Sequence, residues 1–71
     1  MLNVAGKYRE AVLDYKEYEH VVGFNNLNDN FYYRREQAAV EGKMYQQAID
    51  DINRAIALKP NDYLYNVERA S

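Results

Sequence analysis

YQQAIDDINRAIALKPND, residues 45–62, is the stretch that decides the fold of this 71-residue chain. Its apolar side chains recur at intervals of three and four residues, which is the period of one face of an α-helix. They are Tyr45, Ala48, Ile49, Ile52, Ala55 and Ile56. Pro60 ends this helix after Lys59, because the residue before a proline is disfavoured in the α region. Asn61 and Asp62 then supply capping side chains for a further helix.

An earlier copy of the same pattern begins 37 residues before this one. Residues 6–15, GKYREAVLDY, align without gaps with residues 43–52, KMYQQAIDDI. Each segment has a tyrosine, an alanine three positions later and a β-branched residue directly after that alanine. Neither segment shows the period of two that a strand requires, so both are predicted to be helices. A repeat of this length is typical of stacked helix units.

The remaining boundaries follow from asparagine and glycine positions. Residues 23–30 are rich in asparagine and are predicted to form a loop, with Asp29 or Asn30 as the cap of the next helix. That helix covers roughly residues 31–41 and ends before Gly42. We therefore expect an all-α chain of about four helices, the last of them truncated. The short connections predict that neighbouring helices are antiparallel.

Residues 45–62 resemble the second helix and closing turn of a tetratricopeptide repeat. In that family an aromatic residue, an Ala-Ile pair, a further alanine and a terminal proline recur at these spacings. The resemblance implies an α-solenoid of antiparallel helix pairs. In it, Ala48 and Ala55 are small so that helices can approach closely. The three isoleucines that would fill the space between repeats are Ile49, Ile52 and Ile56.

The resemblance covers nearly the whole chain and implies its organisation. Residues 6–22 look like the second helix of one repeat, residues 30–60 like one complete repeat and residues 62–71 like the start of a third. Residues 31–38 are similar to first helices in a bacterial branch of the family, which suggests a fragment of a bacterial protein. The chain departs from the family pattern at Arg35 and Glu36, where a large apolar and a small residue are usual, and at its inter-helix glycine, which lies one position early.

Composition argues against several functional classes. A net charge of −2 lacks the basic footprint that binding to nucleic acid or to an anionic membrane requires. His20 is the single histidine and cysteine is absent, which excludes multi-histidine and thiolate metal centres. The longest apolar stretch is too short to span a bilayer. We therefore predict no cofactor, no metal, no catalytic residue and no membrane insertion in this segment.

The charged residues are interpreted as parts of solvated helix faces. Three carboxylates in the first helix have helical spacing and form such a face more readily than a catalytic pair. They are Glu10, Asp14 and Glu17. Asp50 and Asp51 precede Arg54 by four and three residues, which predicts surface ion pairs. Arg34 and Arg35 are likewise expected in a salt-bridged surface.

The leading functional hypothesis is a scaffold for protein–protein interaction that binds a peptide or protein partner on a groove, without catalysis. The groove candidates lie on one face of each first helix and are Tyr33, Gln37, Glu41, Tyr65 and Arg69. The second hypothesis is a self-association module that forms a homo-oligomer through its exposed repeat ends. A nucleic-acid-binding helical domain is a distant third, and an enzyme is less favoured still. The sequence leaves the compartment open between cytoplasm and periplasm.

Overall fold

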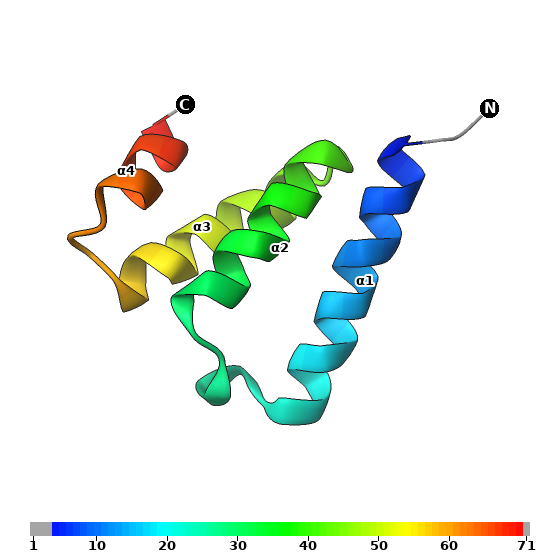
Figure 1. The fold of residues 1–71 in the computed structure, drawn as a ribbon, viewed down its shortest axis with the longest axis horizontal. Coiled ribbons are helices and arrows are strands. Elements are labelled where there is room, and N and C mark those ends of the chain that lie inside the picture. The colour runs from blue at the N-terminus through cyan, green and yellow to red at the C-terminus, as the bar shows by residue number, and fades with distance from the viewer. Residues whose placement is uncertain (1–3, 71) are drawn as a thin grey trace.

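The computed structural model describes residues 4–70, and all regular elements in this part of the chain are helices (Figure 1). In chain order they are α1 (Val4–Val22), the 3-10 helix η1 (Phe24–Asn26), α2 (Asp29–Glu41), α3 (Tyr45–Leu58) and α4 (Tyr63–Ala70). Successive α-helices run in alternating directions (Figure 1). The prediction of an all-α chain with four α-helices is confirmed over residues 4–70.

The connection between α1 and α2 is more ordered than the predicted loop. η1 occupies its centre, and α2 begins at Asp29. The N-cap is Asn28, whose extended backbone allows its Oδ1 to accept a hydrogen bond from the Phe31 amide at 2.9 Å. The prediction of Asp29 or Asn30 as the cap is therefore wrong, because the side chain that reaches the first free amides lies one residue earlier.

The connection between α3 and α4 follows the prediction. α3 ends at Leu58, two residues before Pro60. The Oδ1 of Asp62 accepts hydrogen bonds from the amides of Leu64 at 2.9 Å and Tyr65 at 3.3 Å. Asn28 and Asp62 thus cap α2 and α4 in the same way.

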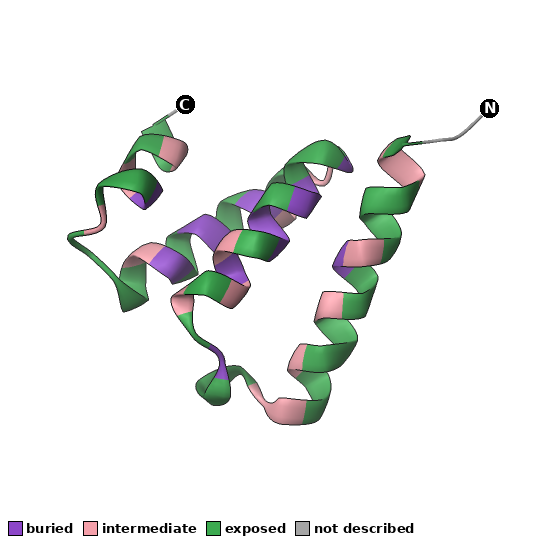
Figure 2. Ribbon diagram, viewed as in Figure 1, coloured by how far each residue is buried: buried purple, intermediate pink, exposed green. Residues whose placement is uncertain are grey.

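The core lies on the facing sides of α2 and α3 (Figure 2). α2 packs against both α1 and α3, and α4 packs against α3. Two clusters of apolar side chains fill the spaces between them. One cluster is Val12, Ala38, Ala39 and Ala48; the other is Leu27, Tyr32, Ile52, Ala55 and Tyr65.

The interface positions in α3 agree with prediction except at one residue. Ala48 and Ala55 are buried, which lets helix axes approach closely, and Ile52 is also buried. Ile49 is 51% exposed, so the expectation that it fills a space between helices is wrong. It lines an open groove instead.

A fully buried ion pair joins α2 to α3. Arg35 Nε lies 2.9 Å from Asp51 Oδ2, and Arg35 Nη2 lies 2.8 Å from Asp51 Oδ1. Both residues have no exposed surface. Gln47 donates to both carboxylate oxygens of Asp51. Arg35 Nη1 also donates to Glu19 Oε1 of α1 at 2.8 Å, so one guanidinium connects three helices.

The sequence-based interpretation of these charges is therefore corrected. Arg35 is ion-paired, as expected, but in the interior rather than on the surface. Asp51 pairs with Arg35 and not with Arg54, which reaches Glu19 Oε2 at 3.3 Å. The reason is that helix packing turns Asp51 toward α2, where a bidentate guanidinium outcompetes a neighbour on the same helix.

Aromatic rings enclose the Arg35 guanidinium. Its central carbon lies 5.2 Å from the Phe31 ring centroid and 5.7 Å from that of Tyr32. Burial alone lowers the pKa of Arg35, but the hydrogen bonds to Asp51 and Glu19 raise it above its ordinary value. The side chain therefore stays charged in the core.

α1 lies close to the end of α2 at Gly42. Arg9 Nε donates to the Gly42 carbonyl at 2.7 Å, and a Cβ at Gly42 would lie 3.1 Å from the backbone nitrogen of Arg9. Glycine is required here by this approach rather than by its φ of −84°. The left-handed residue of the turn is Lys43, with φ of 61°.

We predict that Arg35→Met and Asp51→Leu each lower the free energy of unfolding by about 3 kcal/mol or more, because each leaves a buried charge short of its partner. The double variant is expected to recover most of this loss, since apolar side chains replace both charges. Urea denaturation of the four proteins measures the coupling. Additive losses in the double variant would contradict the role assigned to the pair.

Candidate interaction groove

The structure places two of the sequence-predicted groove residues against each other. Tyr33 of α2 and Tyr65 of α4 have ring centroids 5.2 Å apart. Tyr65 is only 5% exposed, and its hydroxyl donates a hydrogen bond to Asp29. Tyr65 thus joins α4 to α2 as a core residue, and half-buried Tyr33 covers it.

The other three candidates are exposed but are not brought together. Gln37 lies on the outer face of α2 and donates to Glu36 Oε1 at 2.8 Å. Glu41 is exposed in the last turn of α2. Arg69 is exposed on α4, and it is the one member of the predicted set that lines the open hollow between α2, α3 and α4.

This open groove has a volume of about 620 Å³. Its floor is apolar, and three of its large side chains are strongly exposed: Tyr45 by 59%, Ile49 by 51% and Val40 by 41%. Ala48 and Ile52 continue the floor toward the core. We call this hollow the α2–α3–α4 groove.

Sequence reasoning missed most of this groove because it treated the apolar face of α3 as wholly buried. The internal repeat offers no signal of this exposure. Ile49 occupies the position of Val12, which is fully buried between helices. These two equivalent side chains, a valine and an isoleucine, have different surroundings in the tertiary structure.

Carboxylates line one side of the groove. Glu36 is 5% exposed, and burial, with smaller contributions from the charges of Glu68 and Asp51, raises its pKa above the ordinary value. The hydrogen bond from Gln37 acts in the opposite direction. Glu68 and Arg69 of α4 complete the polar rim. The groove thus combines an apolar floor with a desolvated carboxylate, which a cation could neutralise.

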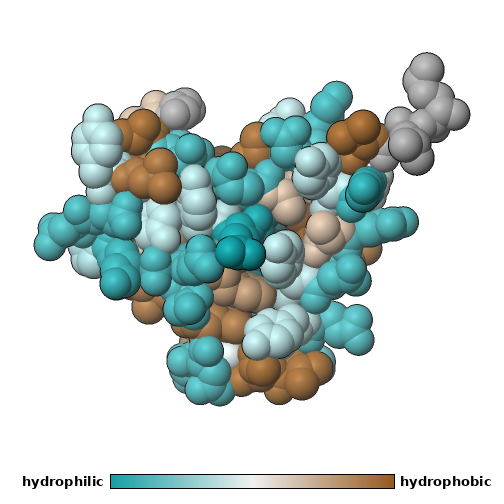
Figure 3. Space-filling model, in the orientation of Figure 1, coloured by the Kyte–Doolittle hydropathy of each residue, from teal (hydrophilic) through white to brown (hydrophobic). Residues whose placement is uncertain are grey.

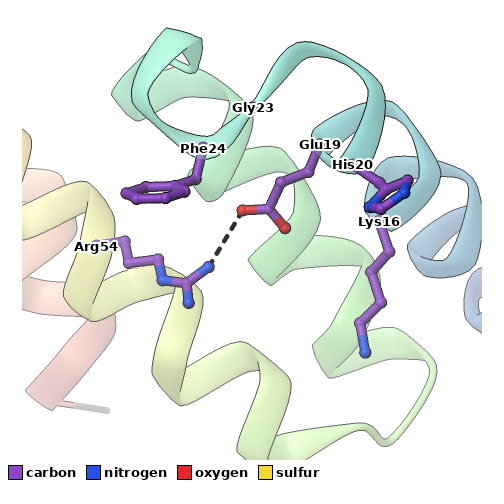
Figure 4. Close-up of a pocket in the computed structure, with 6 residues that line it drawn as sticks. All are labelled: Lys16, Glu19, His20, Gly23, Phe24 and Arg54. Carbon is purple, nitrogen blue, oxygen red and sulfur yellow. Dashed lines mark hydrogen bonds and ion pairs between the residues drawn. The ribbon is translucent and has the colours of Figure 1, made fainter.

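A second, charged pocket of about 460 Å³ lies where α1 ends (Figure 4). Glu19 reaches across it to Arg54, while Lys16 and His20 lie on the other side of the carboxylate (Figure 4). Glu19 also holds Arg35, so its two oxygens already have structural partners. This pocket therefore has less binding capacity left than the α2–α3–α4 groove.

An aromatic hollow of about 480 Å³ lies between α1 and the start of α2. Phe31 forms its floor, with Tyr15 edge-on at 5.5 Å and Tyr18 stacked at 5.7 Å between ring centroids. Ala11 and Asp14 complete the lining. Tyr18 exposes 55% of its surface, so this aromatic cluster is open to a partner.

Metal sites and membrane spans are not found within residues 4–70. No group of three or more His, Cys, Asp or Glu side chains in this part of the chain has the arrangement to hold a metal ion. None of the described helices combines the length and apolar character that crossing a membrane demands.

Comparison with known proteins assigns no relative. No protein-family model matches the chain, and neither a curated protein nor a solved structure shows significant similarity to it. Function is therefore inferred from the residues and their geometry.

We predict that Glu36→Gln raises the free energy of unfolding at neutral pH by about 0.5–1 kcal/mol, because it removes a desolvated charge and keeps an acceptor for Gln37. The folded-state pKa of Glu36 is raised, so its contribution to stability is full below the unfolded pKa and is lost as pH rises through the folded value. The difference between the two proteins should therefore shrink toward pH ~4. Urea denaturation at several pH values tests this, and a gap that widens in acid contradicts it.

Tyr65 is predicted to be the tyrosine that ionises last. Burial, the hydrogen bond with Asp29 and the nearby carboxylates raise its pKa to about 12 from 10.0. Stability from neutral Tyr65 is thus complete below pH 10 and is lost as pH rises to about 12. When tyrosinate absorbance in the ultraviolet is followed as pH rises, the component that appears at the highest pH should be absent in Tyr65→Phe. That component should remain in Tyr63→Phe, because the Tyr63 side chain is 83% exposed.

Proposed function

We propose that this chain is a non-catalytic protein-interaction module of the tetratricopeptide type, which binds a segment of a partner protein in the α2–α3–α4 groove. The observation that carries the proposal is the exposed apolar floor formed by Val40, Tyr45 and Ile49 between three helices. Burying such surface against a partner is favourable by about 25 cal/mol per Å². Interaction sites are enriched in patches of this kind.

Helix packing supports the assignment to this repeat type. α2 and α3 form an antiparallel pair (Figure 1), and each carries a fully buried alanine, Ala39 in α2 and Ala55 in α3. The cap of α2 recurs in the flanking helix α4, as Asn28 and Asp62 illustrate, and the stripe of α3 recurs in the flanking helix α1. Stacked units of this kind present their grooves on a rigid scaffold.

The groove chemistry defines the partner segment. The partner segment needs apolar side chains that cover Tyr45 and Ile49, because these two residues provide most of the exposed surface of the groove floor. A lysine or arginine beside them would pair with Glu36 and Glu68 and offset the burial of the Glu36 carboxylate. We therefore expect a short peptide segment that carries both apolar and basic residues.

Selection of a random displayed peptide library against the wild-type chain tests this proposal. We expect binders rich in apolar and basic residues, with dissociation constants of about 10–100 µM, since the groove is short and open. Ile49→Lys should weaken them at least about tenfold, because it places a charge on the apolar floor. Calorimetric titration of the selected peptides measures both values.

Leu13→Lys is the matched control. Leu13 is 58% exposed on α1 and lies outside the groove, so this variant has the same change in charge and should bind as wild type. Glu36→Gln should weaken the basic peptides and leave purely apolar ones unaffected. Peptides that bind wild type and Ile49→Lys equally, or a selection that yields no binder, would overturn the proposal.

A further inference from the structure

Exposed apolar side chains form two surfaces, one on the last helix, α4, and the other between the first two α-helices, α1 and α2. On α4, Tyr63 is 83% exposed and Leu64 is 47% exposed. Figure 3 shows the hydrophobic patch over α4. On the other side, the aromatic hollow between α1 and α2 leaves Tyr18 exposed. Neither surface belongs to the α2–α3–α4 groove floor.

The internal repeat relates these two surfaces to contacts already present in the chain. The sequences of α1 and α3 align with a shift of 37 residues, which pairs Ala11 with Ala48. α2 and α4 are related by a shift of 34 residues, since their caps are Asn28 and Asp62. The interface of α2 with α3 and α4 is therefore a template for an interface of α4 with another α1 and α2.

The template predicts charge complementarity between the two surfaces. The buried partners in the chain are Arg35 of α2 and Asp51 of α3. A shift of 34 residues carries Arg35 to Arg69, and a shift of 37 residues carries Asp51 back to Asp14. Arg69 is exposed on α4, and Asp14 lies on the rim of the aromatic hollow. Each copy therefore carries the arginine of the predicted ion pair, Arg69, on α4 and its aspartate, Asp14, at the aromatic hollow.

The aromatic contacts transfer in the same way. Within the chain, Tyr65 of α4 contacts Tyr33 and Asp29 of α2. The equivalent of Tyr65 is Phe31, the floor of the aromatic hollow, and the equivalent of Asp29 is Tyr63. Tyr63 of one copy is therefore placed over Phe31 and its ring neighbours in the other copy.

We propose that the chain associates head to tail with a second copy of itself, with α4 of one copy seated in the aromatic hollow of the next and Arg69 paired with the second copy's Asp14. The small net charge of −2 opposes this association only weakly. The contact joins two different surfaces, so each added copy leaves one of each kind open. Assembly therefore proceeds beyond the dimer or closes into a ring.

Sedimentation velocity over a wide concentration range tests this assembly. The average mass of the wild-type chain should rise past that of a dimer. Asp14→Arg and Arg69→Glu should each lower the association constant by about tenfold or more, because like charges then face each other. The double variant, which exchanges the two charges within one chain, should restore growth. A one-to-one mixture of the two single variants should also restore growth, because every contact between unlike variants joins opposite charges.

Matched variants distinguish this contact from association through any other surface of the chain. Glu17→Arg makes the same charge change on α1 outside the hollow and should associate as wild type. Tyr18→Glu should abolish association by placing a charge among the rings. Ile49→Lys tests the proposed peptide groove and should leave self-association unchanged. Circular dichroism verifies the helix content of every variant.

Three results would each overturn the head-to-tail contact. The first is a wild-type chain that stays monomeric at millimolar concentration. The second is a folded double variant that fails to recover association. The third is a mixture of single variants that gains no mass over the separate variants, although head-to-tail contacts between unlike variants would join opposite charges. Loss of peptide binding in Ile49→Lys reports on the groove floor, which none of these three results involves.

Discussion

The ion pair of Arg35 and Asp51 is the interaction on which the rest of the structure depends. It lies between the two apolar clusters, because Arg35 follows Tyr32 and precedes Ala38 along α2. Through Glu19 the same guanidinium also holds α1. Shifting any of these helices by one turn would leave a buried charge unpaired, which is far more costly than an imperfect apolar contact. The pair therefore selects one helix register where alanine-rich surfaces alone would tolerate several.

Equivalent residues of the repeat have different structural environments, and both functional proposals follow from that difference. Val12 is buried while its counterpart Ile49 lines the α2–α3–α4 groove. Asp51 is buried with an arginine while its counterpart Asp14 lies on the rim of the aromatic hollow. Side chains suited to a helix interface are thus displayed on the surface. A peptide segment satisfies one such surface, and a second copy satisfies the other.

Much of the helix layout was predictable, but little of the site was. Periodicity and breakers placed the helices to within a few residues, since local hydrogen bonds and apolar spacing suffice for that. The cap at Asn28 was missed because several neighbouring asparagines offer the same chemistry. Glu36 was missed because a charged residue is usually expected on the surface, whereas this one is buried. Ile49 was missed because an isoleucine in an apolar helix stripe is usually expected in the core, whereas this one is exposed.

By itself the sequence determined the helical class, the number of helices, the turn at Pro60 and the repeated stripe, all of which depend on contacts within a few residues. Tertiary structure alone decided which charges enter the core and which apolar residues stay in solvent. The physical reason is that a helix presents several faces, and burial of a given face depends on the distant element that packs there. Asp50 and Asp51 show this, since neighbours in sequence became one exposed carboxylate and one fully buried carboxylate.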